Sequence, residues 1–176
     1  LFDLPLPCAP GFLNFDVSDV PGLFAGFFLS PVCGCLVAGV KILLNLVLNG
    51  TTTAFVGEAA NLAGSCCFIL IASVIYHKNK TKKTALLGML ASAVATSFMF
   101  IFMNAYVTFP MYGKVYGMSM EVIIAAAAKV NPLVHDTVTM MLFSIFPFNL
   151  VKYFICSVVT AAVYKKCSTA LKAIIR

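Results

Sequence analysis

The chain has 176 residues, of which 61% are hydrophobic and only 10% are charged, and its formal net charge is +6. Its apolar stretches are too long and too numerous for one soluble core, so the composition excludes an ordinary soluble domain and indicates an integral membrane protein. The basic residues lie in a short loop and in the C-terminal tail rather than on one face, which argues against a nucleic-acid partner.

The first part of the chain predicts a loop followed by a short helix. Residues 1–6 form an apolar fragment that looks like the end of a helix, and residues 7–19 are rich in Pro, Gly, Asn and Asp, as is typical of a loop. Ser18 or Asp19 is a candidate N-cap for an apolar helix that ends near Ser30.

The rest of the chain contains four apolar segments that are long enough to cross a hydrocarbon core, at about residues 32–48, 55–76, 84–107 and 137–164. Lys41 lies near the middle of the first of them. An Ala-rich run at residues 123–128 predicts a further short helix at the surface. No gap is long enough for a soluble domain, so we expect a single transmembrane domain over residues 1–176.

The distribution of lysine predicts the orientation in the cell membrane. Lys78, Lys80, Lys82 and Lys83 lie in one short loop, and more basic residues lie in the tail, so this Lys78–Lys83 loop and the C-terminus are expected to be cytoplasmic. Counting spans from there places residues 7–19, 49–57 and 108–136 outside.

The last apolar segment carries a charge at membrane depth. Lys152 lies roughly 20 Å of helix from either end of the segment, too far for its side chain to reach the interface. Asn149 shares its face, and Pro147 leaves a backbone carbonyl without its helical donor. This group predicts a ligand pocket or an ion path, and the alternative is a lysine that pairs with a carboxylate for structure alone.

Other polar residues converge on the external side. Glu58 and Asn61 share a face at the outer start of one span, Asn104 lies at the outer end of the next, and Asp16 and Asp19 lie in the external loop. No buried carboxylate is expected in the inner half of the membrane, so the pattern does not form a proton ladder. Amides beside many aromatic residues suit a flat, neutral heteroaromatic solute with hydroxyl groups.

Four motifs resemble, in order and at compatible spacing, the signature of the riboflavin-specific S component of energy-coupling factor (ECF) transporters: Phe12–Pro21, Gly57–Asn61, Met103–Asn104 with Pro110–Tyr112, and Pro147–Lys152. The resemblance implies an all-α bundle of about six transmembrane helices, of which this chain holds five complete spans and the tail of the first. It also implies a subunit that captures riboflavin from outside, as a transported ligand rather than a cofactor. Its partners would be a transmembrane T component and two cytoplasmic ATPases.

The resemblance also assigns roles to residues of the membrane segments. Asn104 and Lys152 would hydrogen-bond the polar edge of the isoalloxazine ring, and Asn149 and Glu58 would lie in or beside the pocket. The external loop would cover or contact the ribityl end through Asn14, Phe15 and Asp16.

Lys41 departs from the family pattern because Ile42 follows it, and we expect it to pair with Glu58 or Asp19 as a structural contact. The resemblance also implies a first helix that docks on the T component, of which only the last turn, residues 1–6, is expected in this chain.

Two further functions are weighed against capture. The chain has no phosphate-loop motif and is not expected to hydrolyse ATP or to be an enzyme. A proton-coupled carrier or membrane enzyme that uses Lys152 with a carboxylate needs an acid or His beside the lysine, and the available acids are expected at the rim.

The seven cysteines lack zinc-site spacing, so no metal is expected. Few cations lie near the rim besides Lys114 and Lys129, which favours an unphosphorylated ligand.

Overall fold

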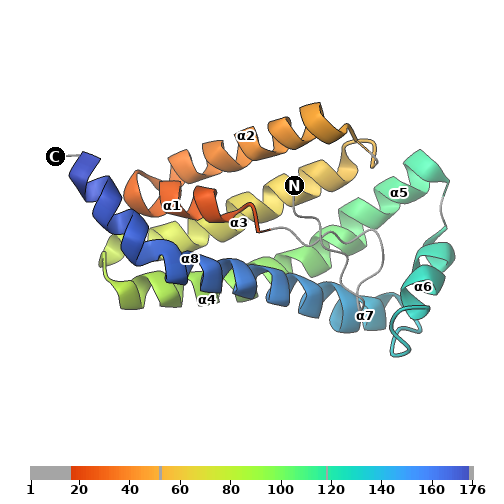
Figure 1. The fold of residues 1–176 in the computed structure, drawn as a ribbon. Coiled ribbons are helices and arrows are strands. Elements are labelled where there is room, and N and C mark those ends of the chain that lie inside the picture. Colours follow the sequence, from red (N-terminus) through yellow and green to blue (C-terminus); the bar gives the residue numbers. More distant parts are fainter. Residues whose placement is uncertain (1–16, 52, 118, 175–176) are drawn as a thin grey trace.

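The computed structural model describes residues 17–174 except for residues 52 and 118, with side chains up to residue 164. Over this part of the chain the protein is helical, which confirms the predicted all-α fold (Figure 1). The elements in chain order are α1 (Val20–Phe28), α2 (Pro31–Asn49), α3 (Val56–Lys78), α4 (Lys82–Met103), the π-helical η1 (Asn104–Thr108), α5 (Phe109–Tyr116), α6 (Met120–Ala128), α7 (Thr137–Met140), the π-helical η2 (Met141–Ile145) and α8 (Phe146–Ile174).

Four helical runs among the described residues are long and apolar enough to cross a membrane: Pro31–Asn49, Val56–Lys78, Lys82–Tyr116 and Thr137–Tyr164. They correspond to the four long segments predicted from the sequence. The other predicted span, α1, has only nine residues, or about 14 Å of helix, and does not cross a membrane by itself. The apolar fragment 1–6 lies outside the described residues.

The centre of the bundle is formed by α3, α4 and α8, which pack along its length (Figure 1). The short α1 lies against α2, α3 and α8, whereas α2 contacts mainly α1 and α3 and is the least buried of the long helices. The α3–α4 connection and the end of α8 lie at one end of the bundle, here called the 79–81 end. The other end, which holds α5, α6 and α7, is called the α6 end.

The contact between α3 and α4 depends on a residue without a side chain. A Cβ atom built on Gly88 would lie 2.7 Å from the backbone oxygen of Ala72 in α3. Backbone cannot move aside as a flexible side chain does, so Gly88 sets the distance between these two helices.

Two π-helical segments allow proline inside the membrane helices. Pro110 comes two residues after η1 and Pro147 two residues after η2. A π turn widens the helix locally, so the proline ring avoids the preceding carbonyl and the chain stays helical. The predicted boundary at residue 107 is therefore too early, because the fourth segment continues through Pro110 to Tyr116.

The carbonyl near Pro147 finds a partner in a distant loop. Proline cannot donate a hydrogen bond, and the Phe143 carbonyl, four residues before Pro147, accepts one from Asn131 Nδ2 at 2.9 Å. The predicted free carbonyl is thus satisfied by the connection between α6 and α7, which ties that connection to the last span.

We expect Gly88→Ala to lower the free energy of unfolding by about 1–3 kcal/mol, because the added methyl group separates α3 from α4. Gly39→Ala is the matched control, since a Cβ at Gly39 meets nothing within 4 Å. Thermal unfolding in detergent measures both, and equal stability of the two variants would contradict the packing argument.

Asp136 makes the start of α7 sensitive to pH. It accepts hydrogen bonds from the Thr139 backbone N–H and hydroxyl, both at 2.7 Å, and these hold the pKa of Asp136 below its ordinary value. A lowered folded-state pKa means that the stabilisation is complete above the ordinary pKa and is lost as pH falls through the lowered one. We therefore expect Asp136→Ala to be less stable than wild type at neutral pH, with a gap that closes in acid.

Asp136→Asn serves as the control, because asparagine also caps a helix but does not titrate. Its advantage over Asp136→Ala should not vary with pH in the same thermal unfolding series. A wild-type advantage over Asp136→Ala that persisted unchanged into strong acid would rule out this cap.

Candidate functional site

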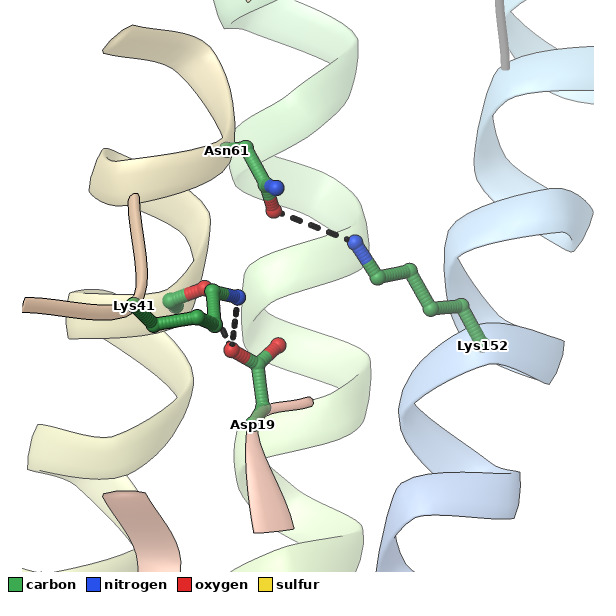
Figure 2. Close-up of polar contacts among 5 residues, drawn as sticks. Asp19, Lys41, Asn61 and Lys152 are labelled. Carbon is green, nitrogen blue, oxygen red and sulfur yellow. Dashed lines mark hydrogen bonds and ion pairs between the residues drawn. The ribbon is translucent and has the colours of Figure 1, made fainter. Parts of the chain in front are cut away.

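Lys152 is buried inside the bundle, with 5% of its surface exposed. Its Nζ extends from α8 and donates a hydrogen bond to Asn61 Oδ1 of α3 at 3.2 Å (Figure 2). It also lies 5.5 Å from the centroid of the Tyr153 ring. Among the described residues the hydrogen-bond partner of this lysine is an amide and not a carboxylate.

An aromatic layer lies on the 79–81 side of this lysine. The Tyr153 ring packs at 4.6 Å from Phe68 and at 6.4 Å from Phe100, between centroids. Gly64 makes room for the layer, since a Cβ there would lie 2.4 Å from the Phe100 ring and 2.7 Å from the Tyr153 hydroxyl. Three long helices thus supply aromatic faces at one depth.

Three asparagines lie about one helical turn from that layer toward the α6 end. Asn61 comes three residues before Gly64, and Asn104 four residues after Phe100. Asn149 comes four residues before Tyr153 on α8. Like α3, α8 runs from the α6 end to the 79–81 end. Asn104 and Asn149 are at least 93% buried. The structure therefore brings the predicted residues Asn104, Asn149 and Lys152 to one level, together with Asn61.

The amide groups of two asparagines have a fixed orientation. Asn104 Nδ2 donates to the Phe100 carbonyl, and Asn149 Nδ2 donates to the Ile145 carbonyl, each at 2.8 Å. A carbonyl can only accept, so the nitrogen must face the backbone in both residues. The Oδ1 atom of each asparagine is then left for another partner, so both side chains present a hydrogen-bond acceptor.

A second polar group lies one turn further toward the 79–81 end. Lys41 Nζ of α2 contacts Asp19 Oδ1 at 2.6 Å and Ser65 Oγ at 3.1 Å, and the Ser65 hydroxyl donates to the same Asp19 oxygen at 2.6 Å. Ser65 comes four residues after Asn61, so one face of α3 contacts both lysines. Figure 2 shows Lys41 and Lys152 approaching this face from opposite sides.

Two expectations about charged residues are resolved by this group. Lys41 pairs with Asp19, which confirms one of its two predicted partners. The placement of Asp19 at the rim is wrong, because its side chain is 0% exposed. The reason is that α1 begins inside the bundle, so the residue before its first turn is also inside.

Glu58 contributes to the turn before α3. Its Oε2 accepts a hydrogen bond from the Thr53 hydroxyl at 2.5 Å, and Thr53 Oγ1 in turn accepts one from the Gly57 N–H at 3.0 Å. Glu58 is three residues from Asn61, at the α6 end of the site. The other predicted residues, Asn14, Phe15 and Asp16, lie outside the described residues.

Asn61 and Ser65 were not predicted to contact the two lysines, and Asp19 was predicted as a partner of Lys41 but was placed at the rim. Asn61 was noticed only as a neighbour of Glu58, and its spacing of four from Ser65 was the available signal for a polar face on α3. Asp19 was assigned to the rim from its loop-like flanks. Its spacing from Lys41 carries no periodic signal, because the two residues lie on different helices.

The geometry defines a multi-span membrane protein with fixed amide acceptors and a buried lysine inside its bundle. No cluster of three or more His, Cys, Asp or Glu side chains that could hold a metal occurs in the described part of the chain. The family model for the substrate-specific component of ECF transporters matches residues 2–164, and the chain belongs to this family. The family consists of substrate-binding transport subunits and not of enzymes, so the predicted family and the absence of catalysis are confirmed.

Curated relatives and a solved structure agree with this assignment. The chain is 29% identical over 170 residues to the riboflavin transporter RibU of Staphylococcus aureus, covering 97% of this chain and 82% of that protein. It is 25% identical over 167 residues to the riboflavin transporter FmnP of Bacillus subtilis, covering 94% and 82%. A solved structure of the S component of a bacterial ECF transporter aligns with a TM-score of 0.73 at 29% identity, covering 97% of this chain and 86% of that one.

We expect Lys41→Met to lower the free energy of unfolding by about 3–5 kcal/mol, because it leaves the buried Asp19 carboxylate without its counter-charge. In the double variant with Asp19→Asn no charge remains to be compensated, so the loss should be smaller than for Lys41→Met alone. Unfolding of the ligand-free protein in detergent measures this cycle. Simple additivity of the two single effects would show that the pair is not coupled.

Proposed function

We propose that this protein is the membrane subunit that captures riboflavin from the external side for import by an ATP-driven partner module. The observation that carries the proposal is the level formed by Lys152 and three asparagines beside an aromatic layer. A flat ring with a polar edge fits such a site, because aromatic faces pack on the ring while amides and an ammonium group meet its heteroatoms. The names of the curated relatives point to the same ligand.

In this proposal Asn104, Asn149 and Lys152 contact the polar edge of the isoalloxazine ring, and Glu58 lies beside the ligand toward the α6 end. We further propose that Asn14, Phe15 and Asp16 cover the ribityl chain, which would extend toward the outside. The ligand is unphosphorylated riboflavin, since Lys114 and Lys129 offer little positive charge for a phosphate at that end.

The partners and orientation are also proposed. The subunit works as a single domain with a transmembrane T component and two cytoplasmic ATPases, because its own chain has no phosphate-loop motif. We place the 79–81 end in the cytoplasm. Four lysines lie at the α3–α4 connection, at positions 78, 80, 82 and 83, and the end of α8 lies at the same end of the bundle.

The competing use of Lys152 in a proton-coupled carrier has less support. Such a carrier needs an acid in contact with the lysine, and Lys152 instead donates to the amide oxygen of Asn61. The buried acid closest along the polar face, Asp19, is paired with Lys41. A membrane enzyme is excluded by the family.

Riboflavin titration of the purified, ligand-stripped protein tests the function, with quenching of flavin fluorescence as the readout. We expect saturable quenching, and we expect Lys152→Ala to weaken binding by about 10- to 100-fold, because a charged hydrogen-bond donor is lost from a buried site. Absence of quenching by the wild-type protein would refute the proposal.

Lys129→Ala is the matched control, since Lys129 is an exposed lysine after α6. It should bind riboflavin as the wild type does. If Lys152→Ala also bound with unchanged affinity, riboflavin capture would stand but the assignment of Lys152 would be wrong.

A further inference from the structure

Within the described part of the chain, only one of the two Asp19 carboxylate oxygens has a hydrogen-bond partner. Lys41 and Ser65 both contact Oδ1, while Oδ2 is buried and has no hydrogen-bond partner among the described residues. Buried polar atoms are nearly always paired, and an unpaired carboxylate oxygen is among the most costly exceptions. This atom therefore requires an explanation beyond the ion pair.

Helix capping does not supply that explanation. Asp19 occupies the N-cap position of α1, but its side chain makes no capping hydrogen bond. The backbone oxygen alone serves the first turn, by accepting from the Leu23 N–H at 3.0 Å. Oδ2 is free of both structural roles that an aspartate at this position normally performs.

The free oxygen faces the site described above. Figure 2 shows the second carboxylate oxygen of Asp19 on the side toward Lys152, whose side chain extends from α8. An ammonium group carries three N–H donors, and Asn61 accepts from one of them. A ligand between the two side chains would meet a buried acceptor on one side and a buried donor on the other.

We propose that Asp19 is a ligand-contacting residue that determines specificity, with Oδ2 accepting a hydrogen bond from the ring imide N–H of the bound flavin; this inference rests on the proposed function. An imide edge presents a carbonyl, an N–H and a second carbonyl in sequence. Lys152 donates a hydrogen bond to the ring carbonyl next to this N–H. Asp19 and Lys152 together therefore recognise an edge on which a hydrogen-bond acceptor is followed by a donor.

The depth of Asp19 favours the ring over the ribityl chain as its partner. Its hydrogen-bonded partner Ser65 directly follows Gly64, the residue that makes room for the aromatic layer. A place beside the aromatic layer of Phe68, Phe100 and Tyr153 suits a flat ring better than a hydroxylated chain. The hydroxyl groups of the chain are better accommodated toward the α6 end, away from this layer.

The test compares riboflavin with N3-methylriboflavin, which lacks the imide N–H, on wild type and on Asp19→Asn. In this variant the amide oxygen stays toward Lys41 and Ser65, because both donate, so Nδ2 replaces the free oxygen and the acceptor becomes a donor. Dissociation constants are measured by fluorescence quenching, and thermal unfolding without ligand reports whether the variant is folded.

We expect the wild type to bind N3-methylriboflavin at least about tenfold more weakly than riboflavin. In Asp19→Asn the ratio of the two dissociation constants should fall close to one, because this variant binds riboflavin more weakly. Glu121→Gln, the same change at an exposed residue of α6, should keep the wild-type ratio.

The outcomes separate the two proposals. A wild type that binds riboflavin and its N3-methyl analogue equally overturns the role of Asp19 and leaves the proposed function intact, whether or not the variant folds. A folded Asp19→Asn variant that keeps the wild-type ratio also overturns it. A wild type that binds neither flavin refutes the proposed function itself.

Discussion

The buried ion pair between Asp19 and Lys41 is the interaction on which the arrangement of this bundle depends. Either charge alone inside the bundle would cost several kcal/mol, so the two helices that carry them, α1 and α2, are held in one relative position. The Ser65 hydroxyl adds α3 to the pair. At its other end α1 is fixed by a 2.9 Å hydrogen bond between the Gly26 carbonyl and His77 Nε2. The short helix is thereby anchored at both ends and contributes to the site although it does not span the membrane.

Departures from regular helix geometry occur where the polar residues lie. Asn104 is the first residue of η1, and Asn149 follows η2 by four residues. Each π segment precedes a proline, and the backbone around each accepts hydrogen bonds from side chains of Asn104, Asn131 or Asn149. Since water does not reach these carbonyls in a bilayer, the amides are needed for the helices to keep this geometry. The same residues therefore support the backbone and present acceptors to the interior.

Membrane class, helix positions and the burial of Lys152 could be predicted from the sequence, because hydropathy and the depth of a charge within an apolar run are local properties of a segment. The π segments could not, because a proline in an apolar run predicts a break as readily as a widened turn. The contacts of Asn61 and Ser65, and the burial of Asp19, were also out of reach. They depend on how far α1 enters the bundle and on which face α3 turns toward its neighbours, and both are properties of the packed structure. Family resemblance singled out Asn104 and Asn149 as candidate site residues, but it could not predict the backbone carbonyls that orient them.

The tethering of the Asn104 and Asn149 amides has a kinetic consequence. Side chains already held by their own helices lose little conformational entropy when a solute arrives, so ordering of the site contributes little to the barrier for association. Differences in affinity among solutes of similar shape should then arise mainly from how fast each one leaves. Under the function proposed above, such a subunit would select its cargo by residence time, because a solute has to be retained until the subunit meets its partner module.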